Sequence, residues 1–139
     1  MPRDTRTGGV LESMILPSLR RGGYTYQIGV NIGTRLGGGR HLVDVLAQKD
    51  NIQCLISLKW QQTGGTAEQK IPFEVLCLME AIQTNSGKFQ KAYLVLGGLG
   101  WKLREFYTGG GLSKYLKHDE YVDIVNLESF IALANKSHL

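Results

Sequence analysis

The residues best suited to chemistry fall in one stretch, from His41 to Glu74, whose pattern predicts two strands, a tight turn and the start of a helix. A carboxylate on the first strand and a lysine on the second, both beside apolar runs, are costly to bury without a partner. A metal-bound phosphate would be such a partner. The polar residues of interest in the stretch are Asp44, Ser57, Lys59, Gln61, Glu68 and Glu74.

The second of these strands directs its polar side chains to one face. Its even positions from 52 to 60 are apolar. Because side chains alternate across a strand, the odd-numbered Ser57, Lys59 and Gln61 share the other face.

The turn between the two strands decides whether Asp44 joins that face. A two-residue turn at Asp50-Asn51, which tolerates positive φ, pairs residue 44 with Ser57 and makes Lys59 the diagonal neighbour of Asp44. A three-residue turn would shift the register by one and move Asp44 to the other face unless a bulge corrected it.

Composition indicates one globular domain spanning residues 1–139. The chain has 42% hydrophobic and 20% charged residues, and no apolar run approaches the roughly 20 residues of a membrane span. The opening residues MPRDTRTGG lack the apolar core of a signal peptide. Cys54 and Cys77 lie inside apolar runs, which predicts two reduced core thiols and a cytoplasmic protein.

The chain is basic, with a formal net charge of +4 and a pI near 9.1, which is compatible with a polyanionic partner. Arg20, Arg21, Arg35 and Arg40 fall around glycine-rich turns, where guanidinium groups and backbone can both approach phosphate.

The order of expected elements predicts an α/β fold with a mixed sheet covered on both faces. Pro72 indicates either that the regular part of the central helix begins there, which puts Glu74 in its first turn, or that an earlier turn is kinked. The expected elements are a helix at 10–20, strands at 24–32, 41–48 and 52–61, a turn at 63–66, the central helix, a strand at 90–96, short helices at 101–107 and 112–117, a strand at 121–125 and a final helix capped by Asn126.

This order, with Asp44 on one strand and Ser57-Leu58-Lys59 on the next, resembles the PD-(D/E)XK nuclease superfamily, as does the segment KWQQTGGTAEQKIPFE. The resemblance covers most of the chain, from Glu12 to about Ile131, and implies a restriction-endonuclease-like core. It implies hydrolysis of DNA phosphodiesters with Mg²⁺, for which Mn²⁺ can substitute. Restriction, homing and junction resolution all stay open, and cutting both strands would call for a homodimer or larger homo-oligomer.

By the same resemblance, Asp44 matches the metal-binding aspartate, and Lys59 matches the lysine that orients the attacking water or stabilises charge on the phosphate. Glu12 matches a helix glutamate that many members add to the metal shell. Ser57 departs from the pattern, which has an acid there, and a serine cannot supply the missing negative charge. Glu74 is the expected replacement and Glu68 the runner-up.

Further roles are expected at the edge of this site. Gln61, with Ser57, is a candidate for contact with the scissile phosphate or water, and the expected DNA contacts are Arg35, Arg40, His41 and Lys70. Each residue also has an ordinary structural interpretation. Asp44 and Lys59 could form a cross-strand ion pair, and Glu68 and Glu74 could be stabilising charges at a helix N-terminus. A DNA-binding or assembly module that lost activity with the acid at Ser57 is therefore the alternative.

Overall fold

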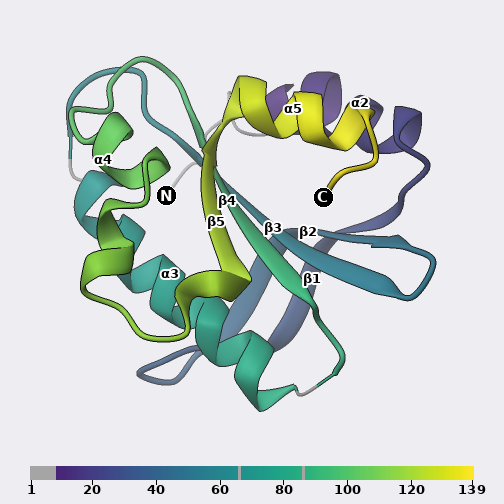
Figure 1. Cartoon of the computed structure of the whole chain (residues 1–139), viewed down its shortest axis with the longest axis horizontal. Helices are drawn as coiled ribbons and strands as arrows, with labels where there is room; N and C mark the ends of the chain where they lie inside the picture. Colours follow the sequence, from purple (N-terminus) through teal and green to yellow (C-terminus); the bar gives the residue numbers. More distant parts are fainter. Residues whose placement is uncertain (1–8, 66, 86) are drawn as a thin grey trace.

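A mixed five-stranded sheet organises the chain in the computed structural model (Figure 1), which describes residues 9–65, 67–85 and 87–139. Residues 1–8 lie outside these ranges, and with them most of the segment that was expected to lack a signal-peptide core. Thr66, the end of the predicted 63–66 turn, also lies outside them. The strand order is β1-β2-β3-β4-β5; the first two pairings are antiparallel and the last two parallel. The strands are β1 (Thr25–Thr34), β2 (Arg40–Lys49), β3 (Ile52–Trp60), β4 (Lys91–Gly97) and β5 (Val122–Asn126).

Helices cover both faces of the sheet, which confirms the predicted α/β class. In Figure 1, α2 and α5 lie together over one side and α3 over the other. No helix in the described part of the chain is long and apolar enough to cross a membrane. The helical segments are η1 (Leu11–Ile15), α2 (Leu16–Arg21), α3 (Ala67–Thr84), α4 (Arg104–Thr108), η2 (Gly111–Lys114), η3 (Asp119–Tyr121) and α5 (Leu127–Asn135).

Two apolar clusters fill the space on either side of the sheet. One packs α3 against the sheet, and the other packs η1, α2 and α5 against the opposite face. Strand β4 contributes to both, because Leu94 belongs to the first cluster and Tyr93 and Val95 to the second. This two-sided burial explains why its sequence is a continuous apolar run. Cys54 and Cys77 are buried and free, as predicted, and burial raises the pKa of Cys54 to about 11.

The β2–β3 hairpin has the predicted two-residue turn. Lys49 pairs with Ile52 and Val45 with Ile56, and Asp50 takes the positive φ of 55° that Asp tolerates in turns. The pairing ends at Val45 and Ile56, one residue before Asp44 and Ser57, so the expected register is confirmed up to that pair.

Strand β2 changes face next to Asp44. Val43 packs in the α3 cluster together with Leu46, whereas Val45 packs in the opposite cluster, which strict alternation would not allow. Gly29, between the β1 partners of Val43 and Val45, has a φ of 62° and is not extended. The irregularity turns the start of β2 toward α3.

Helix α3 begins at Ala67, before Pro72, so Glu68 lies in its first turn and Glu74 two turns along. This corrects the expectation that Glu74 stands in the first turn. Because proline has no N–H, the carbonyl of Glu68, four residues earlier, loses its helical partner. The Tyr107 hydroxyl donates to that carbonyl at 2.7 Å, so α4 supplies the missing bond and lets the helix run through Pro72.

Replacing this hydroxyl tests the account of α3. Tyr107→Phe should lower the free energy of unfolding by about 1–3 kcal/mol, because it leaves a buried carbonyl without a donor. Urea unfolding measures the change, and Tyr115→Phe, at an exposed tyrosine, is the matched control. An unchanged midpoint for Tyr107→Phe would mean that the carbonyl finds another donor.

Candidate functional site

The site begins where β2 and β3 separate. The regular backbone pairing ends at Val45 and Ile56. Beyond this pair the two strands are joined by the Asp44 side chain, whose Oδ2 accepts a hydrogen bond from the backbone N–H of Leu58 at 2.7 Å. This distance is typical of a strong charge-assisted bond to a carboxylate. The contact fixes a half-buried acid at the fork between the two strands.

Glu74 brings a second carboxylate to the same fork from α3. The residue is 6% exposed, and its Oε1 lies 3.4 Å from the Ser57 hydroxyl, which donates to it. Asp44 and Glu74 therefore contact consecutive residues of β3. The serine that stands where the family pattern has an acid meets a glutamate from the helix.

Two basic side chains also contact Glu74. Arg35, in the loop after β1, donates to Oε2 at 3.3 Å, and His41 Nε2 lies 3.5 Å from Oε1. All three contacts with Glu74 are longer than the 2.7–2.9 Å that charge-assisted bonds usually reach. The carboxylate is thus surrounded by partners but held tightly by none of them.

The charges around Glu74 keep it ionised. Burial by itself would raise the pKa of Glu74, but the contact with His41 and the positive charges of Lys59 and Arg35 outweigh it and hold the pKa below its usual value of 4.5. Lys59 follows Ser57 by two residues on β3, and its positive charge is one of the causes that lower the pKa of Glu74. Asp44, Ser57, Lys59 and Glu74 are thus gathered around the fork.

The lowered pKa of Glu74 predicts a pH dependence of stability. An acid with a depressed folded-state pKa stabilises the protein above its unfolded pKa, and this stabilisation is lost as the pH falls through the folded value. The wild type should therefore be more stable than Glu74→Gln. This difference in unfolding free energy should be largest above about pH 5 and shrink below pH 4.5. Urea titrations at several pH values measure it, and a difference that grows on acidification would contradict the assignment.

Gln61 and Glu68, also expected in the site, serve the local structure instead. The Gln61 amide donates to the carbonyl of Gly100 at 2.7 Å, and its oxygen accepts from Ala67 N at 3.1 Å at the start of α3. The Glu68 carboxylate accepts from the backbone N–H of Lys102. Both side chains thereby join the start of α3 to the loop after β4.

The glycines of that loop have a packing reason. Gly98 has a φ of 89°, and a Cβ on it would lie 2.4 Å from the carbonyl oxygen of Gln61; one on Gly100 would lie 2.5 Å from the backbone of Thr63. Only glycine allows this close approach. Close packing of the loop against the segment after β3 therefore explains these glycines.

The remaining candidate residues differ in exposure. Glu12 is exposed on η1, whose buried residues pack in the cluster opposite α3, and Arg40 and Lys70 are exposed. His41, expected to contact DNA, is 2% exposed, because the turn of β2 toward α3 buries it against Glu74. Its side chain therefore faces a carboxylate rather than the surface.

The donors at the fork suit a hard cation in kind. Carboxylate oxygens are the ligands that Mg²⁺ prefers, and Mg²⁺ commonly uses one or two of them and keeps several waters. Within the described ranges, however, no group of three His, Cys, Asp or Glu side chains is close enough to hold a metal. The expected shell of Glu12, Asp44 and a helix glutamate is therefore not assembled, and the fitting donors are Asp44 and Glu74.

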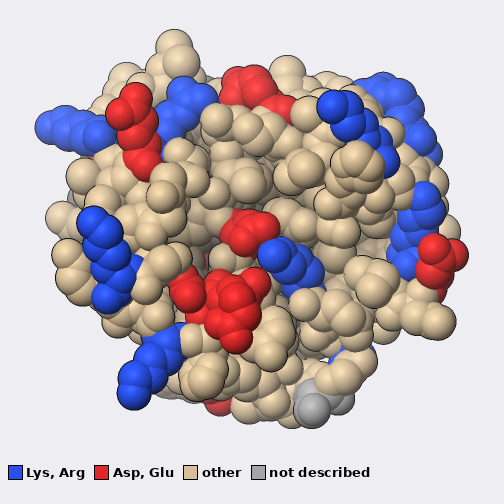
Figure 2. All heavy atoms as spheres, viewed as in Figure 1, with Lys and Arg blue, Asp and Glu red and all other residues tan. Residues whose placement is uncertain are grey.

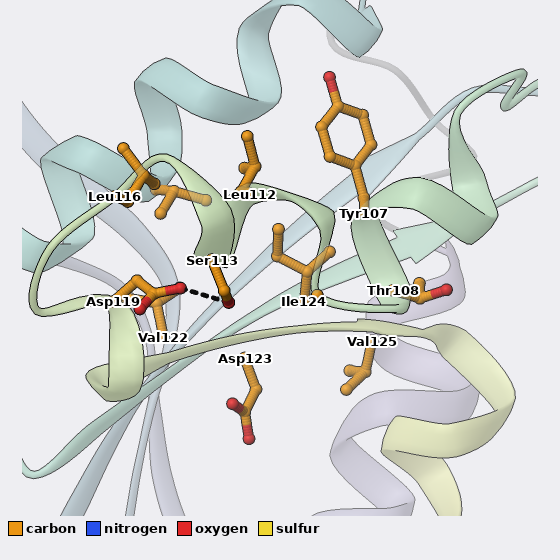
Figure 3. A pocket seen from close by; sticks show the side chains of 12 residues that line it. Tyr107, Thr108, Leu112, Ser113, Leu116, Asp119, Val122, Asp123, Ile124 and Val125 are labelled. Carbon is orange, nitrogen blue, oxygen red and sulfur yellow. Dashed lines mark hydrogen bonds between the residues drawn. The ribbon is translucent and has the colours of Figure 1, made fainter.

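A hollow elsewhere on the molecule contains none of the candidate residues. It has a volume of about 300 Å³ and lies between α4, η2 and β5. Figure 3 shows the apolar side chains of Leu112 and Ile124 turned into it and Asp123 turned away. Its two acids are paired: Ser113 donates to Asp119 at 2.6 Å, and Lys91 lies 3.0 Å from Asp123.

The charges are not uniform over the surface. Figure 2 shows Asp and Glu side chains gathered near the middle of the viewed face, over the region of η3 and the start of β5, with Lys or Arg directly beside them and charges of both signs toward the rim. This face is therefore not a continuous basic surface.

The chain is similar to known proteins over most of its length. A family model described as a PD-(D/E)XK nuclease superfamily domain matches residues 3–138. No curated protein matches the sequence. Among solved structures, the chain is similar to one titled "Crystal Structure of Protein of Unknown Function AF1548", with a TM-score of 0.49 and 13% identity over 81% of this chain; the match spans about half, 54%, of that protein. Because the family model covers nearly its whole length, the chain belongs to the PD-(D/E)XK nuclease superfamily.

Proposed function

We propose that the protein is a metal-dependent DNA endonuclease in which Asp44 and Glu74 hold Mg²⁺ and Lys59 acts at the attacking water or the phosphate. The observation that carries this proposal is the contact of the Ser57 hydroxyl with Glu74, 3.4 Å apart. It returns a carboxylate to the position where the family pattern has an acid and this sequence has a serine. The superfamily supplies the general class, a nuclease.

The residues at the fork have complementary tasks. When bound, Mg²⁺ would polarise the phosphoryl oxygen and lower the pKa of a bound water. The carboxylates of Asp44 and Glu74 would fix its position, Asp44 being held by the Leu58 N–H. The ammonium group of Lys59 would stabilise the negative charge that develops on the phosphate or orient the water.

The basic loop after β1 offers a route for DNA. Arg35 is only partly exposed, 36% at its side chain, and contacts Glu74, while Arg40 at the start of β2 is exposed. A phosphate entering the site would compete with Glu74 for the Arg35 guanidinium, because this planar group donates hydrogen bonds to phosphate and carboxylate alike. One such site cuts one strand, so cleavage of a duplex calls for two copies of the chain.

The decisive experiment is cleavage of supercoiled plasmid and of branched DNA with Mg²⁺, Mn²⁺ and no divalent ion. Nicking or linearisation that needs the ion supports the proposal, and the better substrate separates junction resolution from restriction or homing. If neither substrate is cut with either ion, the endonuclease assignment is wrong.

The alternative is a DNA-binding or assembly module that has lost catalysis, and the serine at position 57 favours it. Binding of Mg²⁺ or Mn²⁺ separates the two. Calorimetric titration should show binding that is lost in Asp44→Asn if the protein is an enzyme, whereas the module should bind DNA without binding the ion at Asp44.

DNA binding should weaken steeply with salt. Contacts of Arg35 and Arg40 with two phosphates would release counterions and lower the affinity roughly tenfold between about 50 and 200 mM salt. Fluorescence anisotropy with a labelled duplex measures the slope in Ca²⁺ or without divalent ions. A flat dependence would exclude the phosphate backbone as the main contact.

A further inference from the structure

His41 is a buried polar side chain with an unusual environment. It is 2% exposed, and among the described residues its Nε2 has no hydrogen-bond partner. The atom is nevertheless directed at a charge, since Glu74 Oε1 lies 3.5 Å away. A buried polar atom without a hydrogen bond destabilises the fold, so its retention next to an acid calls for an explanation.

Glu74 is contacted from two sides, by a loop residue and by a strand residue. Arg35 contacts Oε2 from a loop between β1 and β2, has a partly exposed side chain and stacks over Phe73 at 5.5 Å. His41 contacts Oε1 from inside strand β2. The arginine can therefore leave for a phosphate, whereas the histidine is fixed by the sheet.

Strand β2 also connects the two carboxylates of the site. His41 stands three residues before Asp44, and the change of face at Asp44 lets the first point to α3 while the second bonds to β3. A rigid link between a side chain that contacts Glu74 and the Asp44 carboxylate would fix the separation of the two acids. Such a link is what a two-carboxylate site needs, because metal ligands depend on the groups that orient them.

We propose that His41 is a positioning residue: its Nε2–H faces Glu74 Oε1 and keeps this carboxylate turned toward Ser57 when DNA draws Arg35 away. His41 acts through Glu74 and touches neither substrate nor metal. This inference rests on the proposed function and extends it to a residue that the sequence assigns to DNA contact. It requires the tautomer with the proton on Nε2.

Two substitutions separate positioning from simple packing. In His41→Gln the side-chain amide can replace the Nε2–H, whereas His41→Leu fills the space without a donor. We expect His41→Leu to lower kcat roughly 10- to 100-fold and Mg²⁺ affinity to a similar extent, with little change in KM for DNA. His41→Gln should recover most of both losses. Calorimetric titration with Mg²⁺ gives the affinity independently of cleavage.

Val43→Ala is the matched control, since Val43 is buried on the same strand but packs only in the apolar cluster. It should reduce stability while leaving kcat and Mg²⁺ affinity of the folded protein within about twofold, an allowance below the tenfold scale of supporting residues. Equal losses in His41→Leu and His41→Gln, or unchanged kcat and Mg²⁺ affinity in both, would overturn the positioning role.

A stability measurement keeps the inference testable if the wild type neither cuts DNA nor binds Mg²⁺, a result that would overturn the proposed function alone. His41→Leu, Glu74→Gln and the double variant form a thermodynamic cycle in urea unfolding at pH 7. If His41 holds Glu74, the unfolding constant of the double variant should differ by roughly threefold or more from the value expected when the effects of the two single variants are combined independently. Additive effects would show that the two side chains do not interact and would reject the positioning role.

Discussion

Asp44→Asn is expected to lower the cleavage rate by roughly 100-fold or more, the upper end of the losses seen even for residues that only support a metal site. The substitution removes the negative charge that would hold the cation but keeps the shape of the side chain and one of its oxygens. That oxygen can still accept from the Leu58 N–H, which wild-type Asp44 binds at 2.7 Å. The fold and the affinity for DNA should therefore change little.

The same chain offers a matched control in Asp50→Asn. Asp50 is exposed in the turn of the same hairpin, and its φ of 55° is one that asparagine also adopts readily. This variant should retain full activity, so a plasmid nicking assay on the two proteins isolates the charge at the fork. If Asp44→Asn cuts as fast as Asp50→Asn, the metal is not at Asp44.

Glu74→Ala is expected to reduce cleavage by roughly 10-fold or more, because it removes the carboxylate that stands in for the acid missing at Ser57. It also leaves Arg35 and His41 without their anion. Ser57→Glu in the same protein should restore part of the activity, since the new acid would extend from β3 toward the space that Glu74 vacates. Single-turnover cleavage with saturating DNA compares the variants without a contribution from binding.

Glu80→Gln, on the same helix but without a contact to the fork, is the control for changes in helix charge. Glu68→Ala tests the runner-up acid. Because Glu68 bonds to the backbone of Lys102, we expect this change to lower stability with a small effect on the chemical step. Full activity in Glu74→Ala would mean that the metal is held without a migrated acid.

The pattern of the sequence by itself determined the elements and the pairing of the central hairpin. Alternation on β3 separated the polar face of Ser57 from the apolar face of Ile56, and the two-residue turn at Asp50 set the register. The predicted cap of α5 was also correct, since Asn126 accepts from Ser129 N at 2.8 Å. These features depend on neighbours within a few residues, which is why local patterns are sufficient to predict them.

The tertiary structure decided which side chains surround the fork. Glu74 and Glu68 both looked suitable as donors, but α3 starts before Pro72 because Tyr107 replaces the lost helical bond, and this helix turns Glu74 to Ser57 and Glu68 to Lys102. Each of these contacts joins residues more than fifteen positions apart, and their geometry follows from how the helix packs on the sheet.

The contacts of His41 and Arg35 with Glu74 could not be predicted from the sequence, which indicated DNA contacts for both. A strict alternation along β2 gives no reason for His41 to face α3; the irregularity opposite Gly29 turns it there. The glycine-rich sequence predicted a loop that can approach phosphate, but it could not show that Arg35 lies against an acid of the same chain. Sequence thus determined the strands that carry the chemistry, and the packing of α3 on them determined which charges meet, because that packing depends on contacts between distant parts of the chain.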